Sequence, residues 1–307
     1  MMPMTKKHTH KRTRLLVLAA LLVAGMVNTP GAQAREVHLR YEANWGGLHV
    51  ADFSLSIING GDTYENRFHL ETRGLTRLLT KMAVTATSHG RIAKPPAAQF
   101  GDGAVENAAN AQLAETFLAQ KYRTEYTNRR HFRWVNIVFD DTGGPAHAST
   151  GTAPVKGRED NWNPDEKGPE VLEKVEESYR TGVNDPISMV PQMMAMVRGH
   201  LQGGPASVVA KGFDGRRRFD MDVTYQGLAT RTIGEVKHDV YHVRVVPKPV
   251  AGFKKRHKAL WNGSAYDFYL SRDGRFVPLQ MVPVKHGPVL TLITECDSEC
   301  VIEKVEE

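Results

Sequence analysis

Three short runs between residues 266 and 294 constrain the fold more than any other part of this sequence, because apolar and polar side chains alternate along them. The apolar positions are Tyr266, Phe268 and Leu270 in the first run, Val277, Leu279 and Met281 in the second, and residues 289–294 form the third. Asp273-Gly274 separates the first two, and Asp-Gly favours a two-residue hairpin turn because both residues can adopt positive φ. A period of two gives each strand one apolar face, which predicts an antiparallel sheet with one side on a core.

The same alternation recurs through most of the chain. It predicts strands near residues 37–41, 51–57, 64–70, 84–92, 122–126, 131–139, 219–225, 233–237 and 240–246, with a helical turn at 75–82. Turns every ten to twelve residues are typical of a sandwich or barrel. Asp214-Gly215 predicts a second hairpin turn, Gly227 is expected to end one strand, and Pro247 and Pro249 are expected to break another.

Two segments, residues 104–120 and 142–180, interrupt this pattern. The first is alanine-rich, and Val105, Ala109, Leu113 and Phe117 recur every four residues, which predicts a helix. Residues 140–168 are poor in large apolar side chains and predict a loop, either a tolerated surface insertion or a functional flap. Residues 169–179 predict a short acidic helix.

A methionine-rich segment after Asp185-Pro186 predicts the main helix. Met189, Met193, Met194 and Met196 lie on one broad apolar face that must be buried. Pro191 is tolerated only in the first turn of a helix, so the helix is expected to begin near Ser188. Thioethers adapt their shape, so these four methionines are candidates to line a ligand pocket, with ordinary core packing as the more frequent alternative.

Residues 1–34 have the features of a secretory signal peptide. A basic head precedes an apolar run at 15–27, which is shorter than the roughly 20 residues of a membrane span, and Ala32-Gln33-Ala34 supplies a cleavage pattern. We therefore expect an exported mature chain of residues 35–307 without a transmembrane anchor. The full chain has 40 basic and 34 acidic residues, but five of the basic ones lie in the leader, which leaves a net charge of +1. That balance argues against nucleic-acid binding.

The two cysteines, Cys296 and Cys300, are predicted to form a disulfide, because export permits one. Their short spacing requires a tight turn between them. Two thiolates are too few for a structural zinc site.

No motif in the sequence predicts catalysis, a cofactor or a metal site. The chain has no Gly-x-Ser-x-Gly, His-Glu-x-x-His or phosphate-binding glycine motif. Ser88, His89 and Asp273 could form a nucleophile, base and orienting acid only if the fold brought them together. His238 and His242 lie in an extended stretch, about 13 Å apart, too far to share one metal ion.

Two basic clusters lie beside predicted turns, at residues 216–218 and 254–258. They could contact anionic lipid headgroups or another envelope polyanion. The alternative is that they are solvated hairpin ends that discourage edge aggregation.

Four motifs in this order resemble an exported bacterial family known as domain of unknown function 3108. They are Tyr41-x-x-x-Trp45-Gly46-Gly47-Leu48, Asp185-Pro186-Ile187-Ser188, the Phe213–Arg217 turn, and Trp261 followed by Tyr269–Asp273 and Val277-Pro278-Leu279. The resemblance covers most of the mature chain, with residues 104–120 and 142–180 as insertions. It implies a β-rich periplasmic protein from a Gram-negative bacterium. It implies no catalytic residue.

Together these features predict one mainly β domain, an antiparallel curled sheet forming a barrel or half-barrel with one or two packed helices. Curled sheets often hold apolar ligands in their interiors. We expect a non-enzymatic protein of cell-envelope maintenance that binds a lipid, a lipoprotein or another envelope component. The alternatives are a protein-interaction scaffold that uses a sheet edge or the 142–168 segment, and a hydrolase acting on envelope substrates.

Overall fold

The computed structural model describes residues 35–93, 115–140, 144–154, 170–171, 175–255, 258, 261–285 and 287–297. All of them belong to one compact unit, Ala34–Glu307. The predicted signal peptide lies outside the described residues, as do Cys300 and residues 104–114 of the first predicted helix. Within the described residues, no helix is long and apolar enough to cross a membrane.

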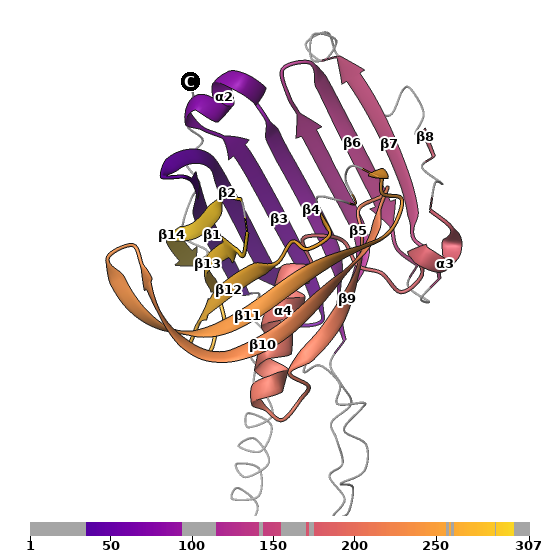
Figure 1. The fold of residues 1–307 in the computed structure, drawn as a ribbon. Coiled ribbons are helices and arrows are strands. Elements are labelled where there is room, and N and C mark those ends of the chain that lie inside the picture. The colour runs from indigo at the N-terminus through magenta and orange to yellow at the C-terminus, as the bar shows by residue number, and fades with distance from the viewer. Residues whose placement is uncertain are drawn as a thin grey trace, which may run out of the picture. The chain divides into compact units, whose positions relative to one another are not determined.

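Fourteen strands in the described part of the chain form a single antiparallel sheet (Figure 1). Its order runs from β8 down to β1 and then from β14 down to β9, so β1 and β14 join the two halves. The strands are β1 (Arg35–Trp45), β2 (Leu48–Asn59), β3 (Thr63–Thr72), β4 (Ala83–Ala93), β5 (Thr116–Thr127), β6 (His131–Val138), β7 (His147–Pro154), β8 (Glu170–Val171), β9 (Ser207–Phe213), β10 (Arg218–Ile233), β11 (Val236–Ala251), β12 (Tyr266–Ser271), β13 (Pro278–Pro283) and β14 (Val289–Asp297). β8 and β9 are the two end strands, so the sheet is not closed.

The main helix, α4 (Met189–Leu201), lies between the two halves of the sheet (Figure 1). Met193, Met196 and Val197 pack against residues of β10, β11 and β12, while Ala195 packs against residues of β3, β4 and β5. Both halves bury apolar side chains on one helix, so the sheet must curve around it. The predicted curled antiparallel sheet with a packed helix is confirmed, as is the helix start after Ser188 with Pro191 in the first turn.

Two short helices complete the described structure. α2 (Gly74–Thr80) connects β3 to β4 and confirms the predicted helical turn. α3 (Glu177–Arg180) follows β8. The prediction of an acidic helix over residues 169–179 is wrong at Glu170–Val171, which is strand β8, and residues 172–174 lie outside the described range.

The helix predicted over residues 104–120 is wrong at its described end, because Thr116–Thr127 is strand β5. Phe117 and Ala119 are buried on one face while Leu118 is exposed on the other. A spacing of four residues fits a helix face, but it is also a multiple of two and fits a strand face equally well. That ambiguity misled the prediction.

The loop predicted over residues 140–168 contains a strand, β7. Between His147 and Pro154 at its ends, β7 is built from Ala, Ser, Thr and Gly, and it pairs with β6 along its whole length. Large side chains are excluded at its centre, where a Cβ on Gly151 would lie 2.5 Å from the indole nitrogen of Trp134. The strand therefore lacks the bulky apolar residues by which strands are recognised.

The structure differs from the sequence prediction at three places where a turn or the end of a strand was expected. Gly227 does not end β10 but occupies a β-bulge with φ of +114°, a conformation that suits glycine. β11 continues through Pro247 and Pro249, because β12 pairs with it only as far as Val245 and leaves its later residues at an edge. Asp273-Gly274 lies in a longer connection between β12 and β13 rather than in a two-residue turn.

Asn184 closes the side of the curl where β5 approaches the edge strand β9. Its backbone N–H donates to Lys211 O at 2.8 Å, and its carbonyl accepts from the N–H of Phe213 at 2.8 Å. Its side-chain amide bonds β5, accepting from the N–H of Ala119 at 3.0 Å and donating to Phe117 O at 2.8 Å. One residue therefore links the two halves of an open sheet.

Candidate functional site

Asp185 is the centre of a buried polar cluster next to this closure. The hydroxyls of Ser88 and Ser188 each donate to its Oδ2 at 2.6 Å. The backbone N–H groups of Ile187 and Ser188 donate to its Oδ1 at 3.0 Å. Asp185, Ser88 and Ser188 are fully buried.

Tyr64 extends the cluster to β3, since its hydroxyl lies 2.8 Å from Ser188 Oγ. An Asp that accepts bonds from the N–H groups two and three residues later organises the turn that precedes a helix. Here the same carboxylate also binds Ser88 of β4, so it fixes the start of α4 to the sheet. These groups are buried, and their hydrogen bonds hold the start of α4 against the sheet.

Burial raises the pKa of Asp185 above its ordinary value of 3.8, and the hydrogen bonds from Ser188 and Ser88 oppose that rise. As pH falls through the raised pKa toward 3.8, the folded chain binds a proton that the unfolded chain does not bind. This group's contribution to the free energy of unfolding therefore increases on acidification. We expect urea unfolding between pH 7 and 4 to show wild-type gaining stability relative to Asp185→Asn. A pH-independent difference between them would contradict this linkage.

A cleft of about 810 Å³ occupies the concave side of the sheet beyond the start of α4. One wall comes from the inward faces of β5 and β6, and the other from the β9–β10 turn, β10 and Trp261. Its lining consists of Tyr122, Thr124, Tyr126, Asn128, His131, Arg133, Val135, Thr152, Pro186, Asp214, Arg216, Arg217, Phe219, Met221 and Trp261. We call this the aromatic cleft. Pro186 follows Asp185 directly, so the buried cluster also positions a residue that lines the cleft.

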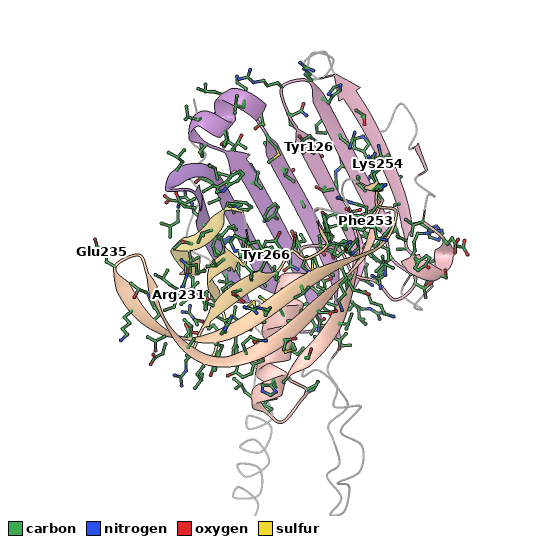
Figure 2. All side chains as sticks on the ribbon, viewed as in Figure 1. Tyr126, Arg231, Glu235, Phe253, Lys254 and Tyr266 are labelled. Atoms are coloured by element: carbon green, nitrogen blue, oxygen red, sulfur yellow. The ribbon has the colours of Figure 1, made fainter. Side chains whose placement is uncertain are left out.

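The second wall is an aromatic cluster that holds an arginine. Trp261 lies 5.2 Å from Phe219 and 5.0 Å from Phe253, measured between ring centroids. The guanidinium carbon of Arg217 lies 5.7 Å from the Trp261 ring and 5.5 Å from the Phe253 ring. Figure 2 labels Phe253, which belongs to this aromatic cluster, and Tyr126, which lies on β5. These rings offer a large apolar surface with a cation beside it.

The β9–β10 turn places Arg217 by a local mechanism that the sequence contains. Asp214 Oδ1 accepts the N–H groups of Arg216 at 3.0 Å and Arg217 at 2.7 Å, and its Oδ2 accepts Nε of Arg217 at 2.7 Å. Across the cleft, Arg133 Nε donates to Thr152 Oγ1 at 3.4 Å. Three arginines and one aspartate line the cleft, and Arg217 neutralises that aspartate. The cleft is therefore suited to an apolar ligand with an acidic group.

The basic cluster at residues 216–218 divides between two environments. Arg216 and Arg217 line the aromatic cleft, whereas Arg218 is buried and bonds Asp220 at 2.7 Å. In the second cluster, Lys254, Lys255 and Lys258 are exposed, and Arg256 and His257 lie outside the described residues.

The four methionines of α4 take separate positions. Met193 and Met196 are buried in the core, and Met194 lines a small pocket of about 110 Å³ beside β1 and β2. Met189 packs near Gly212, where an added Cβ would lie 2.5 Å from its methyl carbon. None of the four lines the aromatic cleft, and their contact with a ligand stays a prediction.

The three residues considered for a hydrolytic site do not converge. Ser88 points inward to Asp185, His89 lies on the opposite face of β4 at 3.7 Å from Glu65, and Asp273 bonds Ser271 and Arg275 in the β12–β13 connection. His242 bonds Asp267 at 2.8 Å on the extended strand β11, which also contains His238. Among the described residues, no group of three acidic, histidine or cysteine side chains could hold a metal.

Cys296 belongs to β14, and Cys300 lies outside the described residues. The disulfide between them stays a prediction.

Sequence reasoning identified Arg216, Arg217 and the Asp185–Ser188 motif but missed Tyr126, Arg133 and the facing aromatic rings. Alternation places Tyr126 and Tyr122 on one face of β5, which is a signal for a shared wall. No local signal predicts that Trp261 faces them.

No protein-family model matches the chain, and no curated protein matches its sequence. A crystal structure of a β-barrel-like protein of domain of unknown function 1849 from Brucella abortus is similar in fold. It has 10% sequence identity and a TM-score of 0.45, and the match covers 87% of this chain and 99% of that chain. Membership of domain of unknown function 3108 stays a prediction.

Proposed function

We propose that the mature chain is a non-enzymatic periplasmic protein of envelope maintenance, and that it binds a lipid or the acyl part of a lipoprotein in the aromatic cleft. The observation that carries this proposal is the cleft of about 810 Å³, lined by aromatic side chains and arginines. Ligand pockets of roughly 300–1,000 Å³ with mostly apolar walls and a few polar groups are typical of small-molecule sites. The predicted signal peptide and the resemblance to an exported family support the location.

The two ends of such a ligand match different parts of the cleft. Tyr126 and Trp261 provide apolar surface for an acyl chain, and the buried Phe219 packs against Trp261. Arg133, which is exposed on β6, provides a planar guanidinium that can bind a carboxylate or phosphate with two hydrogen bonds.

Binding is tested by native mass spectrometry of the purified mature chain, lipid extraction, and titration with a fluorescent fatty acid. Thr124 lies on the cleft face of β5, and we expect Thr124→Trp to fill the cleft and abolish binding. Trp261→Ala should weaken binding by about tenfold or more, since truncating an aromatic anchor costs on the order of 2 kcal/mol.

Thr85→Trp is the matched control, because Thr85 is exposed on the outer face of the neighbouring strand β4. It should bind like wild-type, and thermal melts verify that each variant folds. Absence of a co-purifying lipid together with no fatty-acid binding by wild-type would refute the proposal. Equal binding by Thr124→Trp would refute this location.

A second candidate, a protein-interaction scaffold, is favoured by the edge strand β9. In the described structure its outer edge is bridged only at Gly212, by Asn184, and Val209 is 57% exposed. An extended peptide can add to such an edge through backbone hydrogen bonds. Val209→Pro should then abolish partner capture while leaving fatty-acid binding unchanged, because proline removes an edge N–H. Deleting residues 142–168 cannot separate the candidates, since it removes β7.

A further inference from the structure

α2 presents its apolar side chains to solvent. Leu75, Leu78 and Leu79 are 66%, 64% and 77% exposed, and no residue of α2 is buried. Isolated exposed leucines are common on protein surfaces, but three on one short helix form a patch. A surface helix ordinarily turns its apolar side toward the core, so the orientation of α2 is the reverse of the usual one.

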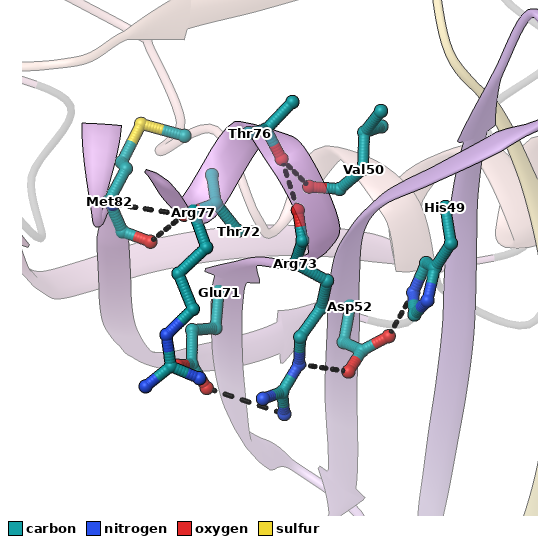
Figure 3. Close-up of polar contacts among 9 residues, drawn as sticks. All are labelled: His49, Val50, Asp52, Glu71, Thr72, Arg73, Thr76, Arg77 and Met82. Atoms are coloured by element: carbon teal, nitrogen blue, oxygen red, sulfur yellow. Dashed lines mark hydrogen bonds and ion pairs between the residues drawn. The ribbon is translucent and has the colours of Figure 1, made fainter. Parts of the chain in front are cut away.

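Polar contacts hold α2 in this orientation (Figure 3). The N–H of Arg73 donates to Val50 O at 2.9 Å, and its Nε donates to Asp52 Oδ2 at 2.6 Å. The hydroxyl of Thr76 donates to Val50 O at 2.6 Å. Arg77 pairs with Glu71 at 3.2 Å. The helix is bonded to β2 and β3 through its polar side, which leaves the leucines directed outward.

The β1–β2 turn adds two more apolar side chains next to α2. Trp45 and Leu48 are each 59% exposed at the ends of these strands. The backbone of this region contacts the start of α2, since a Cβ on Gly74 would lie 2.9 Å from His49 O. We call the set of Trp45, Leu48, Leu75, Leu78 and Leu79 the apolar rim.

Three exposed cations flank the apolar rim. Lys81 is the residue after α2, and the β5–β6 turn brings Arg129 and Arg130 beside it. The N–H of Arg129 donates to Thr80 O at 3.3 Å, and its guanidinium bonds Leu78 O. None of the three cations forms an ion pair with another described residue. The acidic residues near α2, Asp52 and Glu71, are paired with Arg73 and Arg77.

We infer that the apolar rim docks on the surface of an anionic lipid bilayer. Leucine and tryptophan side chains enter the interface between headgroups and acyl chains, where tryptophan is especially favoured. Lys81, Arg129 and Arg130 contact the anionic headgroups. This charge complementarity favours a membrane over a protein partner. The inference is independent of the proposed function, because vesicle binding does not require an occupied cleft.

The location of the rim relates it to the aromatic cleft. Tyr126, Asn128 and His131 line the cleft at the same end of β5 and β6 that carries Arg129 and Arg130. A bilayer that contacts the rim would therefore lie beside these cleft residues.

The test is flotation of the mature chain with vesicles of phosphatidylethanolamine and phosphatidylglycerol at low ionic strength. We expect wild-type to float and the double variant Leu78→Asp/Leu79→Asp to bind at least about tenfold less, because two apolar side chains are lost from the interface. The control is Leu228→Asp, since Leu228 is 61% exposed on β10, on the hairpin where Figure 2 labels Arg231 and Glu235. This control should float like wild-type.

A charge-reversal pair, Lys81→Glu/Arg130→Glu, separates the electrostatic contribution. It should lower binding to anionic vesicles severalfold and change binding to pure phosphatidylcholine vesicles much less, since its effect depends on lipid charge. Failure of wild-type to float would overturn the inference, and so would equal losses in the Leu78→Asp/Leu79→Asp variant and the Leu228→Asp control. Capture of a protein through the rim without any vesicle binding by wild-type would also overturn it.

Discussion

Replacing Asp185 with alanine is expected to lower the free energy of unfolding by about 3–5 kcal/mol, one of the largest effects of any single substitution in this chain. The carboxylate accepts four hydrogen bonds in a fully buried site, from two serine hydroxyls and two backbone N–H groups. Alanine leaves these four donors without their acceptor and removes the link between the start of α4 and β4. Urea unfolding at pH 7 measures the loss.

Ser188→Ala provides the graded comparison at the same cluster. It removes one donor to Asp185 and the partner of the Tyr64 hydroxyl, but the carboxylate keeps its other bonds. We expect it to cost about 1–2 kcal/mol. An Asp185→Ala variant no less stable than Ser188→Ala would show that the cluster does not hold α4 in place.

Replacing Asn184 with alanine is expected to lower the free energy of unfolding by about 2–4 kcal/mol, because two partly buried backbone groups of β5 lose their hydrogen-bond partners. The N–H of Ala119 and the carbonyl of Phe117 both bond the Asn184 amide. The backbone bonds to β9 remain, so the substitution separates the side-chain link from the strand edge. Hydrogen exchange of the Ala119 amide should increase more than that of the amides between β1 and β2.

Asn136→Ala is the matched control for this experiment. Asn136 is a half-buried asparagine on β6, and the bond that it accepts from Arg123 is 3.3 Å long. Its loss should cost less than about 1 kcal/mol. Equal destabilisation by the two variants would contradict the role of Asn184 as the closure of the sheet.

Asn184, Asp185 and Pro186 are consecutive, and each serves a different part of the molecule. Asn184 joins β5 to β9, Asp185 joins the start of α4 to β4, and Pro186 lines the aromatic cleft. A substitution that breaks the hydrogen bonds of Asn184 or those of the buried polar cluster is therefore expected to alter the aromatic cleft as well. Fatty-acid titration of Asn184→Ala measures that coupling directly.

Local sequence pattern was sufficient where each strand has one buried and one exposed face with large apolar residues. The strands around Leu39, Leu55 and Leu270 are of this kind, and their turns contain glycine at positive φ. Pattern failed at β7, because Trp134 excludes bulky side chains from its centre, and at Phe117, because its four-residue spacing suits two structures. In both cases the missing information belongs to a neighbouring strand.

The candidate sites divide in the same way. The Asp214 turn that holds Arg217 and the Asp185 turn that begins α4 are local, so their residues could be recognised from spacing. Spacing could not identify Ser88, which is 97 positions from Asp185 in the chain. It also could not identify Trp261, which lines the same cleft as Tyr126. The outward direction of the α2 leucines also depends on Val50 and Asp52, which lie on another strand.

Alternation was enough to predict an antiparallel, curled β architecture with a packed methionine-rich helix, because the two faces of a strand are determined by residues that are near neighbours in the chain. Tertiary contacts determine the remaining features: the link between β5 and β9 at Asn184, the buried Asp185 carboxylate, the walls of the aromatic cleft and the apolar rim. Each of these features forms where separate elements of the chain meet. What a side chain does there depends on which partner the fold brings within hydrogen-bonding or van der Waals distance.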